Sequence, residues 1–165
     1  MKKVLVTGGA GFIGYTLVDK LIERNLEVIV VDNLSTGKEE YINPKAQFFK
    51  GDLNHKTFDG YKHYNTKTKS LEDTTLLHIL KDVDTVFHLA ATPQVQYSIE
   101  NPTDNNNLTS TINILEASRK SGVKRLILSS TSAVYGNPKY TPIDENHPIE
   151  TLSPYGLHKL VGEQY

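Results

Sequence analysis

A tyrosine and a lysine four residues apart are the pair in this sequence best suited to acid–base chemistry. Tyr155 and Lys159 fall in a segment with helical spacing, 154–165, that opens with a proline. Residues four apart share one face of a helix, so both side chains can meet the same substrate atom. A phenol ionises near pH 10 and a nearby ammonium favours the phenolate, which would let Tyr155 take a proton from a hydroxyl group. The alternative is an exposed pair on a surface helix.

A run of hydroxyl side chains stands where a ligand could meet this pair. Ser129, Ser130, Thr131 and Ser132 lie at the carboxyl end of a strand predicted over residues 125–129. Open α/β sheets bind their ligands at that end of the strands, and hydroxyl groups there can hold a developing oxyanion. A polar turn with local hydrogen bonds is the alternative explanation.

The chain also carries three glycines in a pattern typical of phosphate binding. Gly8, Gly11 and Gly14 come after a short apolar run, residues 3–6, and at the opening of a helical pattern over 12–24. We expect Gly8 to form a tight turn, Gly11 to let backbone N–H groups approach a pyrophosphate, and Gly14 to let the helix pack closely on the sheet. The helix N-terminus would then face the phosphates. A purely structural turn would give the same pattern.

Asp32 makes the cofactor interpretation more specific. It follows a second β-branched run, 27–31, at the distance from the glycines expected of an acid that binds ribose hydroxyls. A carboxylate there accepts hydrogen bonds from both hydroxyls and repels a 2′-phosphate, so the pattern predicts NAD rather than NADP. Taken alone, Asp32 could be a turn-forming aspartate. Asp52 and the backbone of Leu53, after the third predicted strand, could seat the adenine.

The elements that must position these residues alternate along the chain. Strands are predicted over residues 3–6, 27–31, 46–50, 85–89 and 125–129, and helices over 12–24, 102–121 and 154–165. This alternation, with strands apolar enough to be buried on both faces, predicts a doubly wound, three-layer α/β fold of Rossmann type with a parallel sheet. We expect residues 1–165 to form an NAD-binding domain that is truncated before its last strands and its C-terminal substrate region.

One segment does not follow the alternation. Residues 54–70 are polar and show no clear period, which predicts an inserted surface loop. His55, His63 and the nearby Asp59 raise the alternative of a metal site there. Their irregular spacing favours a solvated loop, so no metal is predicted.

Composition narrows the classes of partner. The 18 basic and 19 acidic residues give a net charge of -1, so neither a nucleic acid nor a membrane surface is a predicted partner. Cysteine is absent, which excludes a disulfide framework and a thiolate metal site. The sequence shows no signal peptide and no apolar run long enough to span a membrane, so a soluble cytoplasmic protein is expected.

Together these motifs resemble the extended short-chain dehydrogenase/reductase family, and within it the NAD-dependent nucleotide-sugar epimerases and dehydratases of the UDP-glucose 4-epimerase type. The resemblance covers the whole chain except residues 54–70. The matching segments are 7–14, 32–33, 51–53, 88–91, 98–102, Asn107, 129–136 and 154–165.

The resemblance implies a role for several of these residues. Tyr155 is the implied general base, Lys159 tunes it and holds the nicotinamide ribose, and Thr131 hydrogen-bonds the reacting oxygen. Asn107 is the implied helix asparagine that supports the site, and His88 is expected to pack rather than react. The implied NAD contacts are Gly8, Gly11, Phe12, Ile13, Gly14, Asp32, Asn33, Asp52, Leu53, Leu89, Ala90, Ala91, Asn107, Ser129, Tyr155 and Lys159.

The implied activity is epimerisation of a nucleotide sugar, most often a UDP-sugar, by transient oxidation at C4. A homodimer of the full-length form, through helices 102–121 and 154–165, is also implied. The nearest alternatives are a reductase, which would usually prefer NADPH, and a 4,6-dehydratase, which would carry acidic residues after Thr131 in place of Ser132 and Ala133. A non-catalytic NAD-binding module is the alternative from another class.

Overall fold

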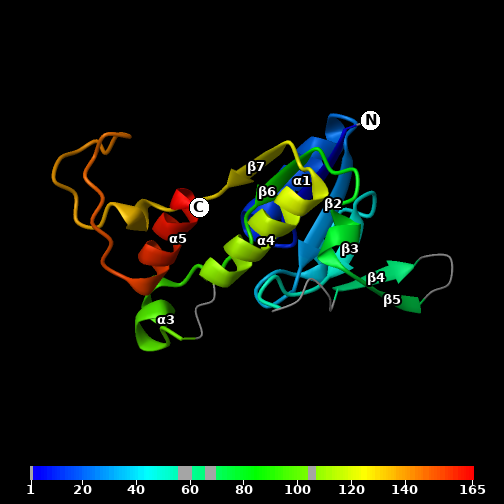
Figure 1. Cartoon of the computed structure of the whole chain (residues 1–165), viewed down its shortest axis with the longest axis horizontal. Coiled ribbons are helices and arrows are strands. Elements are labelled where there is room, and N and C mark those ends of the chain that lie inside the picture. Colours follow the sequence, from blue (N-terminus) through cyan, green and yellow to red (C-terminus); the bar gives the residue numbers. More distant parts are fainter. Residues whose placement is uncertain (1, 56–60, 66–69, 104–106) are drawn as a thin grey trace.

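The apolar runs of the sequence form the centre of a twisted sheet. The computed structural model describes residues 2–55, 61–65, 70–103 and 107–165, and within them seven strands pair in the order β5-β4-β3-β2-β1-β6-β7 (Figure 1). The strands are β1 (Lys3–Thr7), β2 (Glu27–Asp32), β3 (Gln47–Lys50), β4 (Tyr61–Asn65), β5 (Ser70–Thr74), β6 (Thr85–His88) and β7 (Arg125–Leu128).

Five of these strands are parallel, as predicted, and they carry the doubly wound topology. β1 pairs with β2 on one side and with β6 on the other, β3 pairs with β2, and β7 pairs with β6. The chain therefore leaves β1 in one direction and returns to its other side at β6. This reversal of strand order is the topological switch point where open α/β sheets bind ligands.

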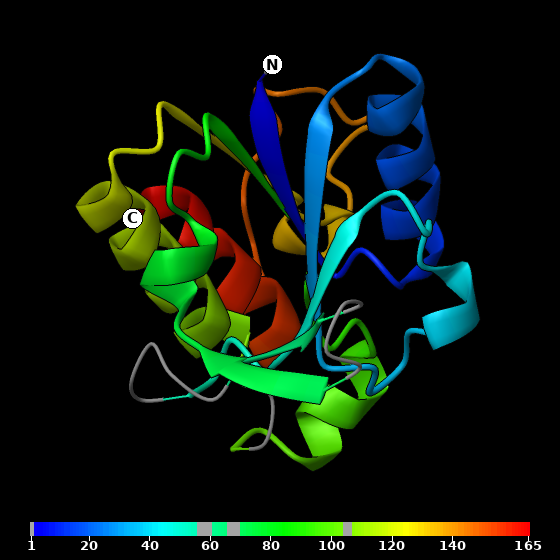
Figure 2. The same ribbon diagram turned by 90° about the vertical axis from the view of Figure 1, so that its right-hand side faces the viewer.

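Helices cover both faces of the sheet and complete the predicted three layers. Figure 2 shows α1 (Phe12–Glu23) on one face and α4 (Asn107–Ser121) with α5 (Pro154–Gln164) on the other. The remaining helices are short: α2 (Leu76–Ile79), α3 (Val95–Glu100), and the 3₁₀ turns η1 (Glu39–Tyr41) and η2 (Ser132–Val134). Within the described ranges, none of the helices is long and apolar enough to cross a membrane.

The core has two parts because the central strands bury both faces. On the α1 side, Val18 and Leu21 pack with the β1 residues Val4 and Val6. On the opposite face, Leu5 of the same strand joins a cluster that includes Leu76, Ile79 and Ile114 from α2 and α4. Each side chain fully removed from water in this way stabilises the fold by about 1.5–3 kcal/mol.

The prediction that residues 54–70 form an inserted loop is wrong for residues 61–65 and 70, which belong to strands. β4 and β5 form an antiparallel hairpin, and β4 continues the sheet antiparallel to β3. Residues 56–60 and 66–69, and with them Asp59 of the metal alternative, lie outside the described residues, as does the side chain of His63. The hairpin forms because the edge of β3 offers free backbone groups, a tertiary effect that local sequence does not carry.

The other boundaries agree with the sequence to within a residue or two, with one exception. The helix predicted over 102–121 begins at Asn107 in the structure, since residues 102–103 form a turn and residues 104–106 lie outside the described residues. Its end is as predicted: Gly122 follows the helix with φ of +73°, the left-handed conformation typical of a helix C-terminus.

Candidate functional site

A cavity of about 380 Å³ opens at the carboxyl ends of the parallel strands, beside the switch point. The wall contains every residue that the sequence assigned to the cofactor, although these residues are spread over more than 150 positions of the chain. They are Gly8, Gly11, Phe12, Ile13, Gly14, Asp32, Asn33, Asp52, Leu53, Leu89, Ala90, Ala91, Asn107, Ser129, Tyr155 and Lys159.

The glycine turn connects β1 to α1 at one end of this cavity. Gly8 has φ of +70°, and a Cβ atom there would lie 2.8 Å from the backbone nitrogen of Ala90. A Cβ on Gly14 would collide with the carbonyl oxygen of Gly8. The turn and the close approach predicted for these two glycines are therefore confirmed. Gly11 precedes α1 without a side-chain cap, so the first N–H groups of the helix remain at the wall of the cavity.

Asp32 lies at the end of β2 and is nearly buried, with 8% of its surface exposed. Its Oδ2 accepts a hydrogen bond from the Ala10 N–H at 3.0 Å, and its Oδ1 accepts one from the Leu34 N–H at 2.7 Å. The carboxylate thus ties the glycine turn to the loop after β2. Both oxygens retain acceptor capacity, because a carboxylate offers about four lone-pair sites.

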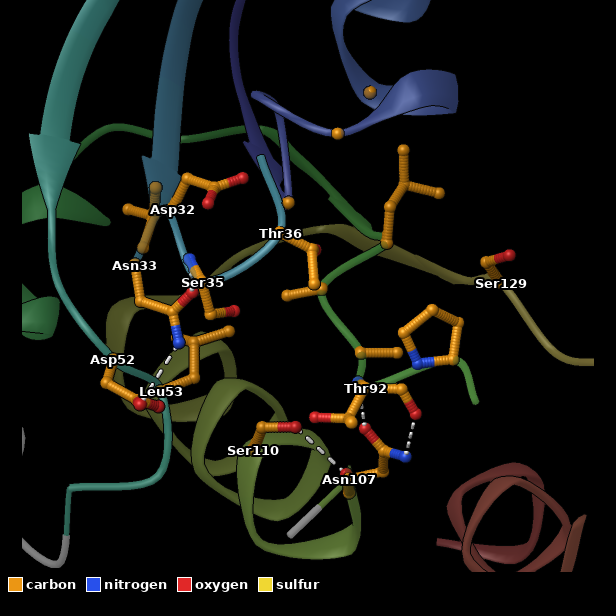
Figure 3. Close-up of a pocket in the computed structure, with 18 of the residues that line it drawn as sticks. Asp32, Asn33, Ser35, Thr36, Asp52, Leu53, Thr92, Asn107, Ser110 and Ser129 are labelled. Atoms are coloured by element: carbon orange, nitrogen blue, oxygen red, sulfur yellow. Dashed lines mark hydrogen bonds between the residues drawn. The ribbon is translucent and has the colours of Figure 1, made fainter. Parts of the chain in front are cut away.

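The neighbouring wall is built by the ends of β2 and β3. The Asn33 side chain donates to Asp52 Oδ2 at 3.1 Å, and Asp52 Oδ1 accepts from the Asn54 N–H at 2.9 Å (Figure 3). The hairpin supports this region from behind: the ring of Tyr61 lies directly against Gly51, and its hydroxyl donates to the carbonyl of Asp52 at 3.3 Å. A side chain at residue 51 would collide with that ring.

The segment after β6 forms the wall across the cavity, and Asn107 holds it in place. Asn107 Oδ1 accepts from the Thr92 N–H at 2.7 Å, and its Nδ2 donates to the Thr92 carbonyl at 3.0 Å (Figure 3). Ser110 donates to the Asn107 carbonyl at 2.9 Å. Asn107 therefore acts on residues 89–93 through two backbone hydrogen bonds.

Tyr155 and Lys159 complete the wall from the first turns of α5. Pro154 begins this helix, as its sequence predicts, and Ser153 caps it by accepting a hydrogen bond from the Gly156 N–H. Tyr155 and Lys159 are 8% and 3% exposed. Burial lowers the pKa of the Lys159 ammonium, and the charge of Glu163 partly opposes this shift. Of the residues that the structure describes, none forms an ion pair with Lys159 within 4.0 Å.

The predicted oxygen-binding residue, Thr131, is placed differently from the others. It lies outside the wall of the cavity and caps η2, where its Oγ1 accepts from the Ala133 N–H at 3.2 Å. Ser129 and Ser130 belong to the wall, and the Ser130 hydroxyl donates to the Glu163 carboxylate. The role of Thr131 stays a prediction.

His88, expected to pack, is fully buried at the base of the site. Its Nδ1 lies 2.8 Å from Thr7 Oγ1, and its Nε2 lies 3.3 Å from Thr111 Oγ1. Thr7 Oγ1 also accepts from the Ala90 N–H, and Thr111 donates to the Asn107 carbonyl. Burial, assisted by the charge of Lys159, lowers the pKa of His88 to about 3. A neutral ring with its proton on Nε2 gives every donor and acceptor in this series of hydrogen bonds a partner.

The sequence reasoning missed several residues of the wall. They are Val31, Ser35, Thr36, Gly51, Asn54, Thr92, Pro93 and Ser110. The position of Ser35 and Thr36, just after a strand whose carboxyl end faces the ligand side, was a usable signal. Thr92 gave no such signal, because its place depends on the distant Asn107.

The order of the strands in the sheet, the glycine turn and the cavity at the switch point together define a Rossmann-type nucleotide-binding fold. Residues 4–165 match the NAD dependent epimerase/dehydratase family over nearly the whole chain. The chain belongs to this family, which confirms the resemblance seen in the motifs and the predicted cofactor class, NAD.

Individual relatives agree with this assignment. The chain is 48% identical over 165 residues to a Methanocaldococcus jannaschii protein provisionally named UDP-glucose 4-epimerase, covering 98% of this chain and 49% of that protein. Its structure resembles UDP-glucose 4-epimerase of Thermotoga maritima solved with UDP-glucose (39% identity, TM-score 0.83), covering 99% of this chain and 49% of that one. The Thermus thermophilus enzyme, solved with NAD, gives 37% identity and a TM-score of 0.82, with 99% and 49% covered. The chain thus spans about half the length of these relatives.

Proposed function

We propose that this chain is the cofactor-binding part of an NAD-dependent nucleotide-sugar epimerase that acts on a UDP-sugar by transient oxidation at C4. The observation that carries the proposal is the meeting of Tyr155 and Lys159 with the glycine turn and Asp32 around one cavity. A module that only bound the dinucleotide would need the turn and the acid, but it would have no use for a buried tyrosine and lysine beside them.

The residues present fit NAD. The Lys159 side chain is buried and forms no ion pair with any residue that the structure describes, a costly arrangement that ribose hydroxyl oxygens would relieve by accepting its hydrogen bonds. The uncapped N-terminus of α1 suits a pyrophosphate, and the carboxylate of Asp32 suits a ribose diol and disfavours a 2′-phosphate. Asp52 and Leu53 stand at the far end of the same wall, where an adenine would lie.

Bound NAD supplies a reversible hydride acceptor for the sugar carbon. The chain's own residues handle the proton and the geometry. Tyr155 Oη takes the proton of the C4 hydroxyl as that carbon is oxidised and returns it when the carbon is reduced again. Asn107 keeps residues 89–93 in place against the cofactor. The nearly buried position of Tyr155 excludes water from this proton transfer.

An epimerase is favoured over a dehydratase by the residues after Thr131. A 4,6-elimination needs an acid near the active-site threonine, whereas Ser132 and Ala133 stand there. The relatives named above are described as 4-epimerases, and the Thermotoga maritima enzyme was solved with UDP-glucose. These observations support a UDP-sugar substrate.

The test has two stages. Calorimetry on the 165-residue chain should show NAD binding at one site and much weaker NADP binding. The complete gene product should then interconvert UDP-glucose and UDP-galactose, or their N-acetylated counterparts, in an NMR assay without added reductant. Tyr155→Phe should reduce the rate by at least about 100-fold, whereas Tyr140→Phe, a change at an exposed tyrosine, should leave it unchanged.

The outcomes separate the alternatives. A 4-keto-6-deoxy sugar as product would identify a dehydratase. Tight NAD binding without turnover of any UDP-sugar would identify a non-catalytic module. The homodimer implied by the resemblance also stays a prediction, which sedimentation of the complete gene product would test.

A further inference from the structure

Ser98 is a fully buried hydroxyl residue that lies outside the cavity wall. It belongs to α3, a helix that packs against α5 in the structure (Figure 1). None of its surface is exposed. Its hydroxyl donates to the carbonyl of Val95 at 2.6 Å, which commits the hydroxyl hydrogen and leaves the oxygen lone pairs available as acceptors.

The acceptor side of this hydroxyl meets the backbone of Tyr155. The Tyr155 N–H donates to Ser98 Oγ at 3.2 Å, across 57 positions of sequence. The first N–H groups of any α-helix lack intrahelical partners, so their hydrogen bonds come from outside the helix. In α5, Pro154 has no N–H and Gly156 is capped locally by Ser153 at 3.1 Å. In this first turn, Tyr155 is therefore the residue whose amide is bonded to another element.

The same turn also contacts η2. A Cβ on Gly156 would lie 2.7 Å from the carbonyl oxygen of Ala133, so the helix touches that backbone directly. The first turn of α5 is thus fixed by two contacts, one with η2 and one with Ser98. The position of the Tyr155 ring follows from where these two contacts place the helix backbone.

We propose that Ser98 is a positioning residue for Tyr155: its hydroxyl bonds the Tyr155 amide and fixes α5 relative to α3, so that the phenol reaches the substrate hydroxyl. This inference rests on the proposed function, in which Tyr155 moves the proton. Ser98 itself touches neither substrate nor cofactor. Its loss should misplace the phenol without weakening the binding of NAD.

The test compares Ser98→Ala with Ser153→Ala in the complete gene product. Both changes remove one hydroxyl acceptor from the same helix N-terminus, so both should lower the melting temperature by a similar amount. Ser98→Ala should lower kcat about 10- to 100-fold, because small misplacements of a reacting group have effects of that size. KM and the Kd for NAD should stay within about twofold. Ser153→Ala should leave kcat within about threefold of the wild type.

A second measurement uses the 165-residue chain and does not depend on turnover. The Tyr155 amide should exchange slowly with solvent deuterium, exchange faster in Ser98→Ala, and regain protection in Ser98→Thr, which keeps the hydroxyl. A Tyr155 amide that is unprotected in the wild type would overturn the proposal. So would equal losses of kcat in the two alanine variants, or a loss in Ser98→Ala matched by weaker NAD binding. Failure of the proposed function would show separately, as absence of epimerisation by the wild type.

Discussion

His88 illustrates how one buried residue can connect several parts of a site. Its two nitrogens connect Thr7, beside the glycine turn, to Thr111 on α4. The same hydrogen-bonded chain reaches the Ala90 amide at one end and the Asn107 carbonyl at the other. The glycine turn and the wall formed by residues 89–93 with Asn107 are thus connected through a single neutral ring, and protonating this ring is unfavourable in the folded state.

Stability should therefore fall as the pH drops from about 6.5 toward 3. The unfolded chain binds a proton on this histidine near pH 6.5, whereas the folded chain resists protonation until about pH 3. The unfolded state then holds more protons in this window, which contributes a loss of up to about 1.4 kcal/mol of unfolding free energy for each unit of pH. Urea unfolding between pH 6.5 and 5 measures this slope above the range in which carboxylates titrate.

NMR of the histidine ring gives the direct check on that prediction. The His88 signals should stay constant down to about pH 4, unlike those of histidine in an unstructured peptide, which titrates near 6.5. A His88 ring that titrates above pH 5 would contradict the prediction.

Asp32 is the residue at which cofactor choice can be tested. Asp32→Asn keeps one acceptor oxygen but turns a donor amide toward either Ala10 or Leu34, whose N–H groups already donate to this side chain. We expect NAD affinity to fall about 10- to 100-fold, since hydrogen bonds to charged groups are worth about 1.5–3 kcal/mol. The ratio of the affinity for NAD to the affinity for NADP should become smaller. Calorimetry with both cofactors measures the change.

Asp84→Asn provides the matched control for that experiment. Asp84 immediately precedes β6 at the opposite end of the sheet and pairs with Lys124 on the surface. Its substitution should leave both affinities unchanged. Equal effects of the two substitutions, or unchanged NAD binding in Asp32→Asn, would contradict the assignment of Asp32.

At the scale of elements, two glycines where the glycine turn meets α1 are expected to have different roles, Gly14 in packing and Gly11 in NAD binding. Gly14→Ala places a methyl group against the Gly8 carbonyl, a backbone atom that cannot move aside, so α1 must shift. We expect a loss of about 1–3 kcal/mol in unfolding free energy and of NAD binding. Gly11→Ala meets only that carbonyl at 3.3 Å and should weaken NAD binding with little effect on stability.

Thermal unfolding and calorimetry on the two variants test this distinction. If Gly11→Ala were as destabilising as Gly14→Ala, the two glycines would share one structural role. If Gly11→Ala bound NAD normally, the surface near Gly11 would not contact the pyrophosphate.

The central strands and helices could be predicted because the spacing of their apolar residues matches the secondary structure that they form. Residues 28–31 are β-branched and apolar, and α1 carries Val18 and Leu21 on one face, so local pattern and tertiary burial agree. The cavity followed from topology, because the carboxyl ends of parallel strands meet at one edge. Thr131 departs from that expectation because the backbone turns into η2, where its hydroxyl serves as a cap.

The hairpin could not be predicted because its strands have little pattern of their own. β4 reads YKHYN, with lysine and histidine inside a strand that β3 pairs only at Phe49 and Lys50. Tyr61 is its structural anchor, yet a tyrosine within a polar stretch looks like a loop residue. The structure explains the position of Tyr61, because its ring packs against Gly51, where there is no side chain.

At the scale of the whole molecule, β7 forms one end of the sheet. Within the described part of the chain it pairs only with β6, and Ile127 on it is 42% exposed. Free edges with apolar side chains promote pairing between molecules. We expect the 165-residue chain to associate as its concentration rises, and Ile127→Lys to suppress this association. Sedimentation velocity over a concentration series measures it.

Leu157→Lys serves as the comparison, since Leu157 is 48% exposed but lies on α5 rather than at the sheet edge. If only Leu157→Lys suppressed the association, the contact between molecules would involve α5 rather than the edge strand β7. A chain that stays monomeric at every concentration would contradict the prediction.

The bridge that Asp32 forms between Ala10 and Leu34 also limits how this protein could evolve. A lineage shifting toward the phosphorylated cofactor would have to discard the acid, and with it the hydrogen bonds that join the glycine turn to the loop after β2. The first mutation on that route would sacrifice binding of the old cofactor before gaining the new one. Adaptive change would more readily begin at Asn33 or Ser35, whose replacement leaves these hydrogen bonds intact, and protein engineers face the same order of steps.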